Sequence, residues 1–246
     1  MNARPLLQRG IDVVAIALLV AVSIIGFGPT FDGPQYLVAG FGALLLGLAI
    51  AWLGARWRWG VLPLAGATVG AYFVLGGALA LPHTTLLGVI PTLETWRQLA
   101  VGVVTSWKQL LTTVPPVAAS DGHLMVPFLM VLVATVLAAS LALRIRAGAW
   151  ALLPAGALLA GQILLGVATP AAPVVQGILF AAVAVVWLAL RHHWTANSAA
   201  VRVDTEAADP AATRSSRTRR LVAAAAVLAI AEPTRLAKSR QARIVT

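Results

Sequence analysis

Few side chains of this sequence combine chemical reactivity with a position inside a hydrophobic stretch. Gln162 is the strongly polar side chain that we place deepest in such a stretch, and a neutral amide there is typical of a hydrogen bond to a neighbouring helix. Asp12 is acidic but lies within a turn of the end of its apolar run, near Arg9. We therefore expect an ion pair with Arg9 that reaches the interface, rather than a proton relay.

Other reactive residue types are too sparse to build a catalytic or metal site. His83 and His123 flank one polar connection, but two histidines without a third ligand at helical spacing are weak evidence for a metal. Asp32, Glu94 and Asp121 have no evident partners, and the sequence has no GxSxG, HExxH or Walker A motif. The chain has no cysteine, which excludes disulfides, thiolate metal sites and a thiol nucleophile. We predict no catalytic residue, no cofactor and no metal.

The elements that must position these residues are membrane helices. Hydrophobic residues make up 60% of the 246 residues and charged residues only 11%, with a mean hydropathy of +0.89, so the chain is not an ordinary soluble domain. The formal net charge of +10 would favour nucleic acid in a soluble chain. Here most of it follows membrane topology, and we predict the lipid bilayer as partner and no nucleic acid.

Apolar runs long enough to cross about 30 Å of hydrocarbon recur along the chain. Such segments must be helices, because lipid offers no partner to backbone polar groups. "GATVG", from Gly66 to Gly70, is a small-xxx-small face that favours helix packing. Gln162 is also predicted to contribute to helix packing. We predict an all-α, polytopic bundle of six transmembrane helices over residues 1–190, with spans at about 11–28, 36–54, 61–81, 124–143, 149–169 and 173–190.

The connections between these spans alternate in charge. Arginines fall in every second connection, whereas only Arg97 and Lys108 fall on the opposite side. By the positive-inside rule, we expect the N-terminus to be cytoplasmic. The abundance of arginine and alanine is typical of a GC-rich bacterial genome, so we expect the membrane to be a bacterial plasma membrane. The first segment could also be a cleaved signal peptide, but no convincing small-x-small site follows it.

The long external connection contains an amphipathic segment at about 93–114. Its Trp-basic-Gln-Leu pattern occurs twice, and the spacing of 11 residues places Trp96 and Trp107 on one helix face. Arg97 and Lys108 lie on the other face. The pattern predicts an extracytoplasmic interfacial helix between the third and fourth spans, with these four residues at the membrane surface. Such a helix either caps the bundle or guides an external substrate.

The C-terminal part has a different composition. Residues 191–220 contain few large apolar side chains and predict a disordered cytoplasmic linker. Within 221–246, "LVAAAAVLAIA" begins like a seventh span but is too short to cross, and a basic tail follows. We interpret it as an incomplete helix of a truncated chain, with a short interfacial anchor as the alternative.

Residues 103 to 166 resemble the N-terminal membrane domain of actinobacterial TgpA-type transglutaminase-like proteins. The similarity lies in "VVTSWKQLLTTVPPV", in the arginines of "LALRIR" and in "WALLP". The resemblance implies an extracytoplasmic transglutaminase-like domain with a Cys-His-Asp triad after the membrane bundle, and a MoxR-type ATPase or other membrane proteins as partners. No catalytic residue carries over, because the triad's positions do not exist in this chain.

These observations favour one function and leave two alternatives. The chain is predicted to be the non-catalytic anchor or scaffold portion of a TgpA-type protein, truncated before its catalytic domain, and not itself an enzyme. A small transporter or permease subunit would need a polar path through the membrane. An intramembrane enzyme acting on a lipid-linked substrate would need reactive residues at one interface.

Overall fold

The computed structural model describes residues 6–80, 92–112, 117–118, 123–145, 148–165 and 173–205. These residues form an all-α protein of seven α-helices, with one short 3-10 helix and one pair of two-residue strands. The chain divides into two compact units, residues 1–192 and 193–246, and the helical bundle belongs to the first.

Five helices of the described residues are long and apolar enough to cross a membrane. A sixth helix, α6 (Ala149–Leu165), is apolar but has only 17 residues, and the end predicted at residue 169 lies outside the described residues. The chain thus has the helices of a membrane protein, and each predicted span coincides with one of them. The five long helices are α1 (Leu6–Ile25), α2 (Gln35–Arg56), α3 (Val61–Ala80), α5 (Met125–Arg144) and α7 (Pro173–Thr205).

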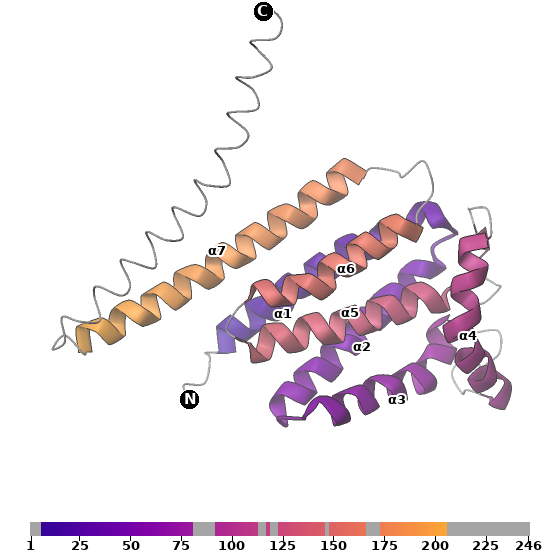
Figure 1. Ribbon diagram of the computed structural model, residues 1–246, viewed down its shortest axis with the longest axis horizontal. Coiled ribbons are helices and arrows are strands. Elements are labelled where there is room, and N and C mark those ends of the chain that lie inside the picture. The colour runs from indigo at the N-terminus through magenta and orange to yellow at the C-terminus, as the bar shows by residue number, and fades with distance from the viewer. Residues whose placement is uncertain are drawn as a thin grey trace, which may run out of the picture. The chain divides into compact units, whose positions relative to one another are not determined.

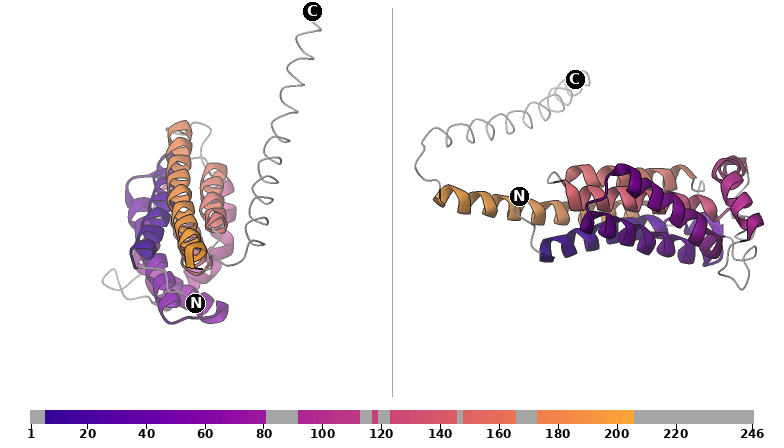
Figure 2. Two further views of the ribbon diagram at one scale, coloured as in Figure 1. Left: turned by 90° about the vertical axis from the view of Figure 1, so that its left-hand side faces the viewer. Right: turned by 90° about the horizontal axis from the view of Figure 1, so that it is seen from below.

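The centre of the bundle is α5, which packs against α1, α2, α3, α4 and α6 (Figure 1; Figure 2). In its apolar window 67% of the residues are buried, the highest share of the five long helices. Phe128, Val131 and Leu132 are fully buried there. The sequence of α5 is apolar on all sides, as expected for a helix with neighbours all around it.

Small residues allow α2 and α5 to approach closely. A Cβ atom placed on Gly47 of α2 would lie 2.9 Å from Thr135 Cβ and 3.3 Å from the Leu132 carbonyl oxygen of α5. Such contacts between helix surfaces provide packing where lipid offers no hydrophobic driving force.

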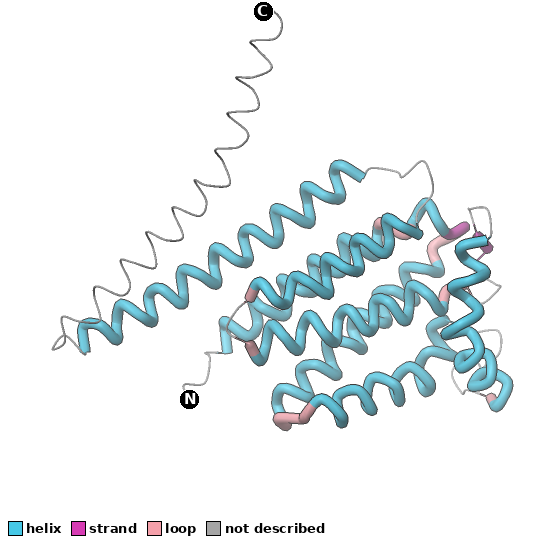
Figure 3. Tube along the Cα trace, viewed as in Figure 1, coloured by secondary structure: helices cyan, strands magenta, loops and turns pink. Residues whose placement is uncertain are grey.

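Two described connections lie at the two ends of the bundle, and Figure 3 draws the turn between α2 and α3 as a loop. At one end, β1 (Phe31–Asp32) pairs in parallel with β2 (Val117–Ala118), which joins the α1–α2 and α4–α5 connections. At the other end, α2 stops in a turn with Arg58 at φ 55°, and Trp59 N–H donates to the Gly54 carbonyl at 2.9 Å. That pattern is a Schellman-type helix stop.

The C-terminal side of the bundle differs from the predicted boundary. α7 does not end at residue 190 but continues to Thr205, so the first part of the linker predicted to be disordered over 191–220 is helical. The segment lacks glycine and proline, and an existing helix extends at little cost through alanine and arginine. The rest of that linker, from residue 206, and the incomplete helix predicted within 221–246 lie outside the described residues.

Candidate functional site: two polar clusters on α7

The first cluster, called the Asp12 cluster, joins Asp12 of α1 to Trp187 and Arg191 of α7. The Trp187 indole N–H donates to Asp12 Oδ1 at 2.9 Å, and Arg191 Nη1 lies 3.6 Å from the same oxygen. The side chains of Asp12 and Arg191 are only 2% and 8% exposed. The predicted interfacial pair with Arg9 is therefore corrected, because Arg9 faces outward on α1 whereas Asp12 faces a cation of another helix.

Arg191 also contacts the C-terminal end of α5. Its Nη2 donates to the carbonyl oxygens of Ala142, at 2.9 Å, and Ile145, at 2.8 Å. The last carbonyls of a helix lack intrahelical partners and form the negative end of the helix dipole, so a cation is favourable there. The guanidinium carbon lies 5.2 Å from the ring centroid of Trp187, within the range of a cation–π contact. One arginine thus links α7 to α1 and α5.

The second cluster, called the Gln162 cluster, joins α6 and α7 to the end of α1. Gln162 Nε2 donates to the Gly26 carbonyl at 2.7 Å. Gln176 Nε2 donates to Gln162 Oε1 at 2.8 Å and to the Val22 carbonyl at 3.0 Å. Val22 belongs to the last turn of α1, whose carbonyls lack intrahelical partners. A Cβ atom on Gly26 would overlap both side-chain amides, so this position requires glycine.

The residues of α7 that take part in the two clusters recur on one helix face. Gln176, Trp187 and Arg191 are separated by about three turns and one turn of helix. Only 11% of the apolar window of α7 is buried, against 67% for α5. Although so little of α7 is covered, polar contacts attach it to the bundle near both ends of this span.

In both clusters, side-chain donors bind backbone carbonyls at or near helix ends. The guanidinium and the amides donate to backbone carbonyls, and the Asp12 carboxylate accepts from an indole and faces the guanidinium. Such bonds fix the register and rotation of neighbouring helices. Within the described part of the chain, no group of three or more His, Cys, Asp and Glu residues is placed to hold a metal ion.

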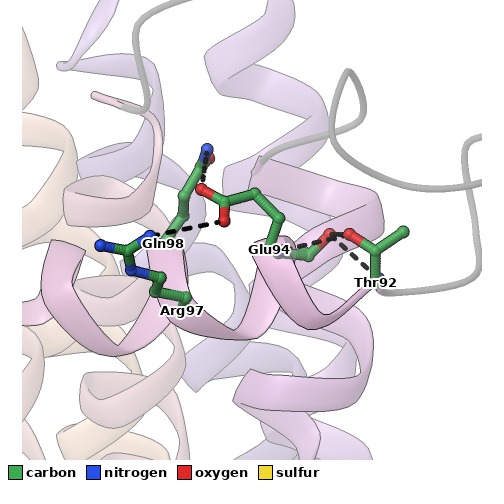
Figure 4. Close-up of polar contacts among 5 residues, drawn as sticks. Thr92, Glu94, Arg97 and Gln98 are labelled. Carbon is green, nitrogen blue, oxygen red and sulfur yellow. Dashed lines mark hydrogen bonds and ion pairs between the residues drawn. The ribbon is translucent and has the colours of Figure 1, made fainter.

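The predicted interfacial segment forms α4 (Leu93–Thr112), which packs on α3 and α5 at one end of the bundle. Its start is capped reciprocally, since Thr92 Oγ1 accepts from the Thr95 N–H at 3.2 Å and Thr95 Oγ1 from the Thr92 N–H at 3.1 Å (Figure 4). In the first turn, Glu94 accepts from Gln98 Nε2 at 3.2 Å (Figure 4).

The face of α4 that packs on the bundle is narrower than the predicted apolar face. Thr95, Leu99 and Ser106 are buried, whereas Trp96 is 49% exposed. The Tyr72 hydroxyl of α3 donates to the Leu99 carbonyl at 3.0 Å, which fixes Leu99 as the centre of the packed face. A Cβ atom on Gly102, which lies on the same face, would overlap the Met125 side chain, so α4 lies close to the start of α5 there. Arg97 is exposed, and the side chains of Trp107 and Lys108 lie outside the described residues.

The remaining predicted residues do not gather at either cluster. Gly66 and Gly70 are exposed on α3, and a Cβ atom at either would have no neighbour within 4 Å, so the predicted close approach is not seen within the described residues. His123 is buried. His83, Asp121 and the side chain of Asp32 lie outside the described residues.

Sequence reasoning missed Gln176, Trp187 and Arg191 as members of a site. Trp187 and Arg191 lie at the predicted cytoplasmic end of the span at 173–190, where tryptophan and arginine are expected at the membrane interface, and Gln176 lies near the start of that span. Their helical spacing was the available signal, because polar or amphipathic residues on one face of an otherwise apolar helix indicate a buried contact.

Comparison of the chain with protein-family models, with curated proteins and with solved structures gave no match.

Proposed function

We propose that this chain is a non-catalytic membrane scaffold, the anchor portion of a TgpA-type protein. The observation that carries the proposal is the use of the buried polar side chains. Gln162, Gln176 and Arg191 donate to backbone carbonyls that lie in other helices or just beyond the ends of those helices. Side chains engaged in this way hold helices together instead of binding a substrate. The TgpA assignment is supported by the sequence resemblance within residues 103 to 166.

The proposal includes an orientation in a bacterial plasma membrane. The N-terminus and the Asp12 cluster lie at the cytoplasmic face, and α4 and the Gln162 cluster lie toward the external face. The distribution of arginine between alternate connections supports this orientation. The pairing of β1 with β2 agrees with it, because both strands belong to connections on the same predicted side.

Reporter fusions test this orientation directly. A reporter after residue 120 is expected outside the cell, and one after residue 205 inside. A fusion at residue 246 is also expected inside. An external reporter at 205 would contradict the orientation proposed for α7.

A transport assay tests the scaffold role against its main alternative. The purified chain in proteoliposomes is expected to show no substrate-dependent uptake, and the variant Gln162→Leu is expected to behave the same way. Uptake by the wild-type chain that disappears in Gln162→Leu would overturn the proposal, because it would place Gln162 on a transport path.

A further inference from the structure

An open groove of about 620 Å³ lies between α3 and α4, away from both polar clusters. Its walls are almost entirely apolar, so Arg97 lines them with the carbon atoms of its side chain and not with its guanidinium. It is lined by Phe73, Leu93, Trp96, Arg97 and Ala100. Leu93 is 84% exposed, so the groove carries apolar surface that neighbouring helices leave uncovered.

The inner wall of the groove is held in place by the packing of α3 on α4. Tyr72 donates to the Leu99 carbonyl at 3.0 Å, and its ring meets Phe73 edge-on at a centroid distance of 5.3 Å. Phe73 is therefore fixed from behind while its other side faces the groove. A wall ordered before binding reduces the entropy that a ligand must lose.

The cation at the rim is available to an anion. Arg97 is 78% exposed, and its Nη1 lies 3.9 Å from Glu94 Oε2, which is longer than a hydrogen bond (Figure 4). Glu94 also accepts a hydrogen bond from Gln98. An exposed pair of this kind contributes little energy, so a phosphate can displace it, and the planar guanidinium binds phosphate through two parallel donors.

We infer that this groove binds one phospholipid with an anionic headgroup. An acyl chain lies along Phe73, Leu93 and Ala100, and the headgroup phosphate pairs with Arg97. The half-exposed Trp96 is an amphipathic side chain suited to the headgroup boundary. The inference rests on the proposed placement of α4 at the external membrane surface, where apolar surface meets charged headgroups.

Thermal unfolding in a neutral detergent tests the site with a defined probe, short-chain phosphatidylglycerol. At a lipid concentration tenfold above the dissociation constant, we expect Tm to rise by about 4 °C. Phosphatidylcholine of the same chain length is expected to give less than half of this rise, and inorganic phosphate at equal concentration none. Equal shifts with both lipids, or an equal shift with phosphate alone, would overturn the inference.

Three variants locate the site. Arg97→Gln removes the cation and Ala100→Trp fills the groove, and each is expected to weaken phosphatidylglycerol binding at least tenfold. The matched control Arg56→Gln removes an exposed cation at the C-terminal end of α2, a helix that does not line the groove, and is expected to leave binding unchanged. Equal weakening in Arg56→Gln would show general charge attraction and contradict the site. Lipid binding is measured in detergent, whereas the reporter fusions measure orientation in cells. A failure to bind phosphatidylglycerol would therefore refute the lipid site without affecting the proposed orientation.

Discussion

The Asp12 cluster and the Gln162 cluster attach the same helix, α7, near the two ends of its apolar span, but with different chemistry. The Asp12 cluster contains a buried carboxylate and a buried guanidinium. The Gln162 cluster contains two neutral amides. A neutral amide can be replaced by an apolar side chain at modest cost, whereas removing one member of a buried ion pair leaves the other charge uncompensated. The two attachments should therefore respond very differently to substitution.

Asp12→Ala should have the largest effect, because it leaves Arg191 buried without its carboxylate. We expect the free energy of unfolding to fall by about 3–5 kcal/mol, with Tm in detergent as the measurement. Arg9→Ala is the matched control, since Arg9 is exposed on the same helix and its loss should change stability by less than about 0.5 kcal/mol. Equal effects of the two variants would show that the Asp12 cluster has no special role.

Gly26→Ala should come next, because the added methyl group overlaps the amides of Gln162 and Gln176. We expect a loss of about 1–3 kcal/mol from the displaced side chains. Gly10→Ala provides the comparison on α1, where a Cβ atom meets nothing within 4 Å and alanine favours the helix. If Gly26→Ala unfolded at the same temperature as Gly10→Ala, the described position of the two amides would be wrong.

Gln162→Leu should cost less, about 0.5–2 kcal/mol, because it removes neutral hydrogen bonds and keeps the side-chain volume. The same measurement on Gln176→Leu should give a similar value. Combining both substitutions should cost less than the sum of the two, since the bond between the amides is lost only once. Strict additivity would indicate that the two amides do not contact each other.

Gly70→Ala on α3 should have the smallest effect of these substitutions, and it should raise the free energy of unfolding. Nothing lies within 4 Å of a Cβ atom there, and alanine stabilises a helix interior by up to about 1 kcal/mol relative to glycine. Gly66→Ala should behave in the same way. A clear loss of Tm in either variant would show that another molecule packs on this face, as the small-xxx-small pattern predicts.

Length and hydropathy predicted the helices well, because a segment in lipid must satisfy its own backbone hydrogen bonds. Each predicted span coincides with a helix, and the amphipathic segment forms α4. The prediction that this helix ends at residue 190 was wrong. The composition of residues 191–205 was interpreted as disorder, although nothing in it stops a helix.

The contacts between helices were harder to predict than the helices themselves. Arg9 is near Asp12 in sequence, but rotation of α1 directs Asp12 toward Arg191, which is distant in sequence. Likewise, the packed face of α4 depends on how closely α3 and α5 approach it. Hydrophobic periodicity carries no information about that distance. It can indicate a buried position for the apolar Leu99 but not for the polar Thr95 and Ser106, which are also buried.

A double-mutant cycle between Asp12 and Arg191 tests the attachment of α7 most directly. The unfolding free energies of Asp12→Asn, Arg191→Gln and the double variant are measured in the same detergent. If the two side chains form the buried pair described above, the double variant should lose less than the sum of the single losses, with a coupling energy of about 2 kcal/mol. Losses that add within about 0.5 kcal/mol would contradict the account, because side chains that do not contact each other show no coupling.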